Sequence, residues 1–321
     1  MTARVVLLVS SPRTAPGLLT RDAWLAVGEA DAVWGVVDEP QAQALVEAGV
    51  VVEPHDRADA AGLARDLVSA AAAGDVVWVG SSDGDPGLNE AIAVEVTRLP
   101  EPPEVELLVG SFDVPGSRLL DVVAVMDRLR SPGGCPWDAE QTGQSLVPYL
   151  LEETHEVIEA IESGDPEHVR EELGDLLLQV AFQSRVAQEH ESAPFGIDEV
   201  AAGLVEKLVR RHPHVFADVE AADAAAVERN WDSIKAQEKP HRNHPLDGVP
   251  HSLPALARAQ KVVSRLEKAG RADLVEAEIE QGGPGADLLD VVRRARSQDI
   301  DAEGALRAVL RRLEDAATSQ T

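Results

Sequence analysis

Apolar residues follow two different periods along this chain, and the change of period divides it. Before about residue 115, short apolar runs such as Val5 to Val9 alternate with amphipathic stretches. Such runs are typical of buried strands. After residue 115, apolar residues recur every three or four positions, which is the helical period. The pattern predicts a multidomain chain, a small α/β domain followed by an all-α helical bundle.

The first region should form a mostly parallel sheet, because its strands alternate with helices. We expect strands at residues 4–10, 32–37, 50–53, 76–80 and 105–110. Helices are expected at residues 18–27, 41–48 and 58–73. Pro115 and Gly116 then interrupt the pattern, so we end this domain, residues 1–115, at Pro115.

The remaining chain is predicted to be helical. Apolar stripes place helices at residues 119–129, 146–163, 166–189, 198–211, 222–238 and 253–268. We assign residues 116–250 to one helical domain and residues 251–321 to a set of C-terminal helices.

Two of these helices carry pairs of acids beside their apolar stripes. Glu153 and Glu156 are three residues apart, as are Glu172 and Asp175, so each pair shares a helix face. Gly164-Asp165-Pro166 forms a turn between the helices, which should therefore run antiparallel. Four converging carboxylates repel one another unless a cation lies among them. Oxygen-only ligands favour Mg²⁺, with Mn²⁺ as the alternative.

Composition and charge limit the classes of molecule that this protein is expected to bind. The formal net charge of −28 argues against binding to a nucleic-acid polymer, because phosphate-backbone contacts need an excess of Lys and Arg. It leaves room for a mononucleotide whose charge a metal offsets. Cys135 is the single cysteine, which fits a reducing compartment. With no apolar segment of membrane-spanning length, we expect a cytoplasmic protein that binds no membrane.

Sequence motifs around the acids resemble those of the MazG family of all-α nucleoside triphosphate pyrophosphohydrolases. The likeness covers about residues 117–268. Its motifs are Gly134-Cys135-Pro136-Trp137-Asp138, Leu151 to Glu156, Glu172-Leu173-Gly174-Asp175, Arg210 to Phe216 and Trp231 to Lys235. The resemblance implies Mg²⁺-dependent hydrolysis of ribo- and deoxynucleoside triphosphates to monophosphate and pyrophosphate. It also implies a house-cleaning role in the nucleotide pool.

The same resemblance implies roles for individual residues. The metal ligands would be Glu153, Glu156, Glu172 and Asp175, with Glu152 as an outer-shell group or as the base that orients the attacking water. The phosphates would be held by Lys207, Arg211 and Lys235, and the nucleoside would lie against Trp231. Because short helices give one chain few pocket walls, we expect a homodimer.

The first region resembles a truncated tetrapyrrole methylase domain. The likeness rests on Pro16 to Thr20, on Gly28 to Val33 and on Gly84-Asp85-Pro86. Ser10 to Thr14 replaces the glycine-rich loop of that family, and the second lobe has no counterpart here. We therefore expect a non-catalytic domain.

Alternatives to the leading hypothesis differ in chemistry. A pyrophosphatase restricted to dUTP or dCTP would use the same acids, and a nucleotide-sensing regulatory protein would use them with little catalysis. A di-iron bundle would need Glu-x-x-His at its ligand positions, whereas here Glu156 follows Glu153 and Asp175 follows Glu172 at that spacing. Near the C-terminus, Gly285 to Leu289 faintly repeats Leu173 to Leu177, which suggests a degenerate second MazG copy.

Overall fold

The computed structural model describes residues 3–217 and 244–319, together with Asp223, Val227, Trp231, Ile234 and Glu238. Contacts divide the chain into two compact units, Met1–Ala202 and Gly203–Thr321. Each unit is described by itself. The domain boundaries expected at residues 115 and 250 stay predictions.

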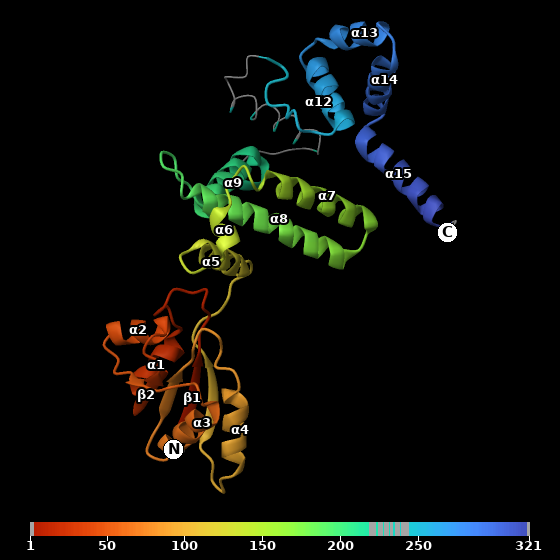
Figure 1. The fold of residues 1–321 in the computed structure, drawn as a ribbon. Helices are drawn as coiled ribbons and strands as arrows, with labels where there is room; N and C mark the ends of the chain where they lie inside the picture. Colours follow the sequence, from red (N-terminus) through yellow and green to blue (C-terminus); the bar gives the residue numbers. More distant parts are fainter. Residues whose placement is uncertain are drawn as a thin grey trace. The chain divides into compact units, whose positions relative to one another are not determined.

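Five parallel strands form the sheet of the first unit (Figure 1). Their order is β3-β2-β4-β1-β5, and their bounds are β1 (Arg4–Val9), β2 (Ala32–Gly35), β3 (Glu53–Pro54), β4 (Val76–Val79) and β5 (Glu104–Val109). In the centre, Val5 lies opposite Val76 on one side and Val105 on the other. The structure confirms the parallel sheet expected from the alternating pattern. β3, expected at residues 50–53, is a two-residue strand at the edge of the sheet, and β1, β2 and β4 each end one or two residues earlier than predicted.

Helices cover both faces of this sheet, which explains the continuous apolar runs of its central strands. One face packs on α3 (Ala60–Ala70) and α4 (Leu88–Thr97), and the other on α1 (Arg21–Glu29) and α2 (Pro40–Glu47). Successive residues of β1 point to opposite faces, so Val5 joins the first core and Val6 the second. The sequence analysis did not predict α4, whose buried residues are just Leu88 and Ile92.

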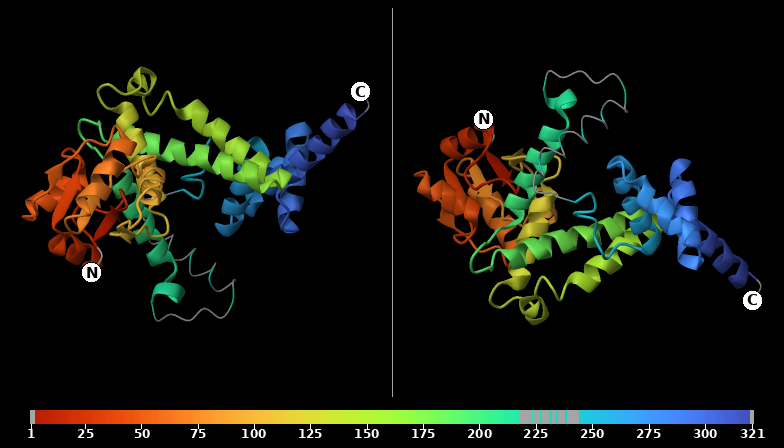
Figure 2. Two further views of the ribbon diagram at one scale, coloured as in Figure 1. Left: turned by 90° about the horizontal axis from the view of Figure 1, so that it is seen from below. Right: turned by 90° about the horizontal axis from the view of Figure 1, so that it is seen from above.

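Four further helices complete the first unit, and α7 and α8 form an antiparallel pair (Figures 1 and 2). Their bounds are α5 (Arg118–Arg130), α6 (Pro136–Glu140), α7 (Val147–Ser163) and α8 (Pro166–Ala187). Met126 of α5, Leu146 and Phe182 of α8 form the buried core. A ninth helix, α9 (Ile197–Arg211), begins in this unit and continues into the second.

The turn between α7 and α8 has the form that the sequence predicts. Gly164 adopts a left-handed conformation, with φ of +76°, at the end of α7. Asp165 caps α8 by accepting a hydrogen bond from the backbone N–H of Glu167 at 3.0 Å, and Pro166 occupies the first turn. The turn fixes how far the two helices are offset along their axes.

The second unit is helical. Its described elements after α9 are α10 (Pro213–Phe216), α12 (Ala255–Lys268), α13 (Ala272–Glu280), α14 (Pro284–Ser297) and α15 (Ala302–Thr318). Val263, Leu266 and Val275 form its core. The helix expected at residues 222–238 lies largely outside the described residues. Within the described ranges, none of the helices has both the length and the apolar content that a membrane crossing requires.

Replacing Asp165 with alanine should destabilise the protein by about 1 kcal/mol, because the first turn of α8 loses its side-chain acceptor. Urea unfolding followed by circular dichroism measures the change. Asp165→Asn is the matched control, since the amide oxygen can still cap the helix, and it should remain within a few tenths of a kcal/mol of the wild type. Equal losses in both variants would contradict the capping role.

Candidate metal site

Three carboxylates converge where α7 and α8 lie side by side. Single carboxylate oxygens of Glu153, Glu156 and Glu172 all lie within 4.8 Å of one another. Helix geometry places the first two on one face of α7, and the antiparallel packing brings the third across from α8. Within the described part of the chain, this is the one group of three or more potential metal ligands.

The other two predicted acids take different positions. Asp175 is half-buried one turn beyond Glu172 on α8 and lies outside the group of three. Its negative charge nevertheless acts on Glu153. Glu152 is exposed on α7 and also lies outside the group. The structure therefore brings three of the four predicted ligands together, with the fourth near enough to interact electrostatically.

Burial and mutual repulsion raise the pKa of Glu153. Burial is the larger cause, followed by the charges of Asp175 and Glu156, with a smaller effect of Glu172. Both causes disfavour the ionised form of the carboxyl group. A bound cation would reverse the second cause, because it replaces repulsion among the acids with attraction.

The donor set fits a hard divalent cation. Carboxylate oxygens are the ligands that Mg²⁺ and Mn²⁺ prefer, whereas structural zinc sites use Cys and His. His168 lies just outside the cluster, with its Nε2 3.2 Å from Oε1 of Glu172. It can orient Glu172 from the side. The sequence analysis did not consider His168, although its spacing four residues before Glu172 on one helix is the signal that identifies it.

A second residue that the sequence analysis overlooked is Arg130. Its side chain is 6% exposed and forms an ion pair of 2.8 Å with Glu189. It also donates to the carbonyl oxygens of Asp138 (2.6 Å) and Gln141 (3.0 Å). Arg130 therefore fixes the segment that leads from α6 toward α7.

The predicted phosphate and nucleoside residues belong to the second unit. Arg211 forms an ion pair of 2.5 Å with Glu238, and its guanidinium lies 5.8 Å from the ring centre of Trp231. Hydrogen bonds from Arg211 are the largest cause that lowers the pKa of Glu238 to about 2. Lys207 is half-buried on α9, and Lys235 lies outside the described residues. The structure thus joins Arg211 and Trp231 through a cation–π contact.

Comparison with known proteins identifies the class. The sequence model of the MazG nucleotide pyrophosphohydrolase domain matches residues 141–216, which contain α7, α8 and the acid cluster. The chain is 36% identical over 212 residues to the Nucleoside triphosphate pyrophosphohydrolase/pyrophosphatase MazG of Thermotoga maritima, which covers 60% of this chain and 81% of that protein. The chain belongs to the MazG family.

Other relatives differ in how much of their length is matched. The chain is 48% identical over 239 residues to an uncharacterised 26.1 kDa protein of Streptomyces cacaoi, covering 74% of this chain and 97% of that one. It is 46% identical over 152 residues to the Nucleoside triphosphate pyrophosphohydrolase of Escherichia coli, covering 46% of this chain and 57% of the relative. The match therefore spans little more than half of the Escherichia coli protein.

In metal-free solution at pH 7, Glu153→Gln should stabilise the protein by about 0.5–1 kcal/mol, because it removes one of several repelling charges. A raised folded-state pKa means that wild-type stability is fully present below the unfolded pKa and declines as pH rises through the folded value. The gain should therefore be absent at pH 4. Chemical denaturation in EDTA at both pH values measures it.

Glu159→Gln is the matched control for this measurement. Glu159 is exposed on the same helix and lies outside the cluster, so its neutralisation should change stability little. An equal gain in the two variants would show that relief of the overall negative charge, rather than relief of repulsion within the cluster, is responsible.

Proposed function

We propose that the protein is an Mg²⁺-dependent nucleoside triphosphate pyrophosphohydrolase. It would hydrolyse ribo- and deoxynucleoside triphosphates between the α- and β-phosphates and release a nucleoside monophosphate and pyrophosphate. The convergence of Glu153, Glu156 and Glu172 is the observation that carries the proposal. Membership of the MazG family and the printed names of the Thermotoga and Escherichia relatives support it.

The acids would divide the work between holding a cation and directing water. We assign Glu153, Glu156, Glu172 and Asp175 as the groups that hold Mg²⁺, or Mn²⁺ as the alternative. When bound, such an ion neutralises phosphate oxygens and lowers the pKa of coordinated water. Glu152 is exposed beside the cluster, where it could act as an outer-shell group or as the base that orients the attacking water.

Cationic residues and a tryptophan would bind the substrate. Lys207, Arg211 and Lys235 are assigned to the phosphates, and Trp231 to the nucleoside. The pairing of Arg211 with Glu238 supports a positioning role for Glu238, since it restrains the guanidinium before a ligand arrives. A fork of guanidinium donors can bind two oxygens of one phosphate at the same time.

The N-terminal sheet would be a shortened relative of the tetrapyrrole methylases without catalysis of its own. The crevice between β1 and β4, where open parallel sheets bind ligands, contains the side chain of Asp85. Asp85 accepts hydrogen bonds from Trp78 Nε1 at 2.8 Å and from the Ser81 N–H at 3.1 Å. The remaining space is about 30 Å³, enough for about two water molecules.

Cellular role follows from the proposed reaction. An enzyme that removes triphosphates of either sugar would serve to clear unwanted nucleotides from the pool. We place it in the cytoplasm, where such triphosphates are made and where the thiol of Cys135 would stay reduced.

Purified protein with Mg²⁺ should release phosphate from nucleoside triphosphates when an inorganic pyrophosphatase is added. All eight common ribo- and deoxynucleoside triphosphates should be substrates. Turnover of dUTP or dCTP alone would favour the restricted enzyme, and turnover of none by folded protein would contradict the proposal. Glu153→Gln should lower kcat/KM by about 100-fold or more and remove the rise in Tm that Mg²⁺ produces, whereas Glu159→Gln should retain both.

A homodimer would cover apolar surface that the helix pair exposes. Leu151 of α7 is 47% exposed and Leu173 of α8 is 49% exposed, although both lie on helices that carry the acid cluster. Exposed leucines on paired helices are typical of surfaces that pack in an assembly. The dimer thus accounts for side chains that a single chain leaves in water.

Sedimentation equilibrium should show a dimer for the wild type, with a dissociation constant that rises about 100-fold or more in Leu151→Ser/Leu173→Ser, because each subunit loses apolar area at the contact. Leu18→Ser provides the control, since Leu18 is also exposed, at 65%, but lies in the α/β region. A monomeric wild type would contradict the dimer without affecting the assignment of the acids.

A further inference from the structure

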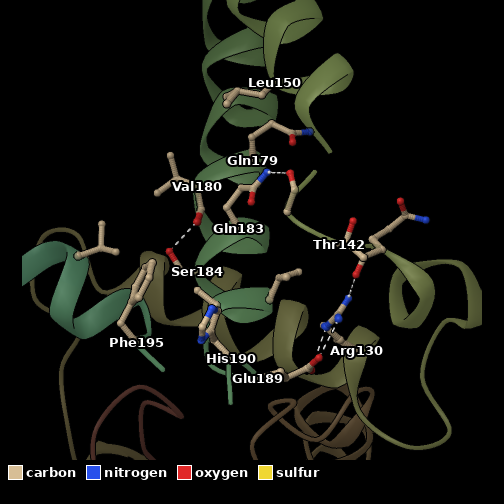
Figure 3. Close-up of a pocket in the computed structure, with 15 residues that line it drawn as sticks. Arg130, Thr142, Leu150, Gln179, Val180, Gln183, Ser184, Glu189, His190 and Phe195 are labelled. Carbon is tan, nitrogen blue, oxygen red and sulfur yellow. Dashed lines mark hydrogen bonds and ion pairs between the residues drawn. The ribbon is translucent and has the colours of Figure 1, made fainter. Parts of the chain in front are cut away.

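Residues of α7 and α8 next to the acid cluster line a cavity of about 670 Å³. Figure 3 shows the side chains that line it. On α7, Leu150 lines the cavity and lies one turn before Glu153. On α8, Gln179 lines it and lies one turn after Asp175. One helical turn is about 5.4 Å, so the cavity and the acid cluster are close enough for a single nucleotide to reach both.

Gln179 carries an unsatisfied hydrogen-bonding group in this cavity. Its side chain is 5% exposed, and its buried Oε1 has no hydrogen-bond partner within the described part of the chain. A buried amide group without a partner destabilises the folded protein, because it has lost its hydrogen bonds to water without replacing them. The terminal torsion of glutamine is broad, so a small rotation can turn the oxygen toward a ligand. Such a group is well suited to a ligand that brings a donor.

Neighbouring polar side chains are already satisfied. Gln183 donates from Nε2 to the carbonyl oxygen of Gly143 at 3.1 Å, and Ser184 donates to the carbonyl oxygen of Val180 at 2.7 Å. Figure 3 shows both interactions beside Gln179. The missing partner is thus a property of Gln179 and not of the cavity wall in general.

The other lining residues indicate what the ligand is. Leu150, Val180 and Phe195 supply apolar and aromatic surface, which suits a flat heteroaromatic ring. Arg130 also lines the cavity, but it is paired with Glu189 and with two backbone carbonyls. The carboxylate of Glu189 would repel a triphosphate. The cavity therefore fits an uncharged ring better than it fits phosphates.

We propose that this cavity binds the base of the nucleoside triphosphate, which leaves the ribose as the part of the nucleoside for Trp231 to contact, and that the Gln179 carboxamide accepts a hydrogen bond from an N–H group on the edge of that base. The inference rests on the proposed function. Every common base has an amine or a ring N–H on its edge, so one acceptor accommodates all of them. Gln179 would reject a ring that lacks such a donor instead of selecting one base among the common ones.

Binding of α,β-methylene analogues tests this assignment without turnover. The wild type should bind the ATP analogue about tenfold more tightly than the analogue of purine riboside triphosphate, whose base has no N–H donor, because the loss leaves Gln179 unpaired. In Gln179→Met the ratio should fall to about one. Inorganic tripolyphosphate, which has no base, should bind the wild type and Gln179→Met equally. Isothermal titration calorimetry measures all three ligands.

Gln188→Met is the matched control, because Gln188 is exposed at the end of the same helix and does not line this cavity. It should keep the wild-type ratio. A tenfold ratio that persists in folded Gln179→Met would overturn the inference, and so would parallel losses of tripolyphosphate binding. A wild-type ratio near one would overturn it even if Gln179→Met failed to fold.

Failure of the inference is distinguishable from failure of the proposed function. If the wild type hydrolyses triphosphates but does not discriminate between the two analogues, the reaction stands and the assignment of Gln179 is wrong. If the wild type neither hydrolyses triphosphates nor binds tripolyphosphate, the proposed function itself is wrong, and the cavity then has no nucleotide to bind.

Discussion

Repulsion among carboxylates opposes the packing of α7 against α8, and the rest of the helical region must offset it. Glu153, Glu156 and Glu172 bring their oxygens within 4.8 Å of one another, an arrangement that costs free energy without a cation. The core around Met126 and Phe182, together with the capped turn between α7 and α8, holds the helices at this distance. The helices thereby hold three carboxylates close enough together to bind one divalent ion.

The groove along α7 and α8 changes character over one helical turn. At the acids it is negative and suited to a metal ion with its phosphates, and beyond Leu150 and Gln179 it becomes largely apolar. A nucleoside triphosphate has the same division, since its charge is concentrated at one end and its flat ring lies at the other. The two ends of the groove could therefore contribute separately, the acids to reaction and the cavity to recognition.

Local patterns predicted more of the fold than of the site. Alternating apolar runs identified the parallel sheet, and residue spacing identified the acid pairs, because both depend on geometry within one element. The short helix α4 escaped prediction, since two buried residues make a weak pattern. Arg130 and Gln179 also escaped assignment to a site. The roles of both residues depend on tertiary contacts, which join residues far apart in the sequence. A sequence pattern does not show whether a buried side chain has a hydrogen-bond partner.

Buried or converging carboxylates serve opposite purposes in the two parts of the first unit. Asp85 follows β4, where Trp78 and the Ser81 N–H donate to its Oδ2 and the Ser81 hydroxyl donates to its Oδ1, and its side chain lines the crevice that a ligand would need. Glu153 meets further carboxylates instead, and burial together with their charges raises its pKa. A carboxylate that accepts hydrogen bonds from neighbouring donors stabilises the fold. A carboxylate that faces other carboxylates is stabilised only when a cation binds among them. The partners of each carboxylate, more than its burial, therefore separate the structural acid from the candidate ligand.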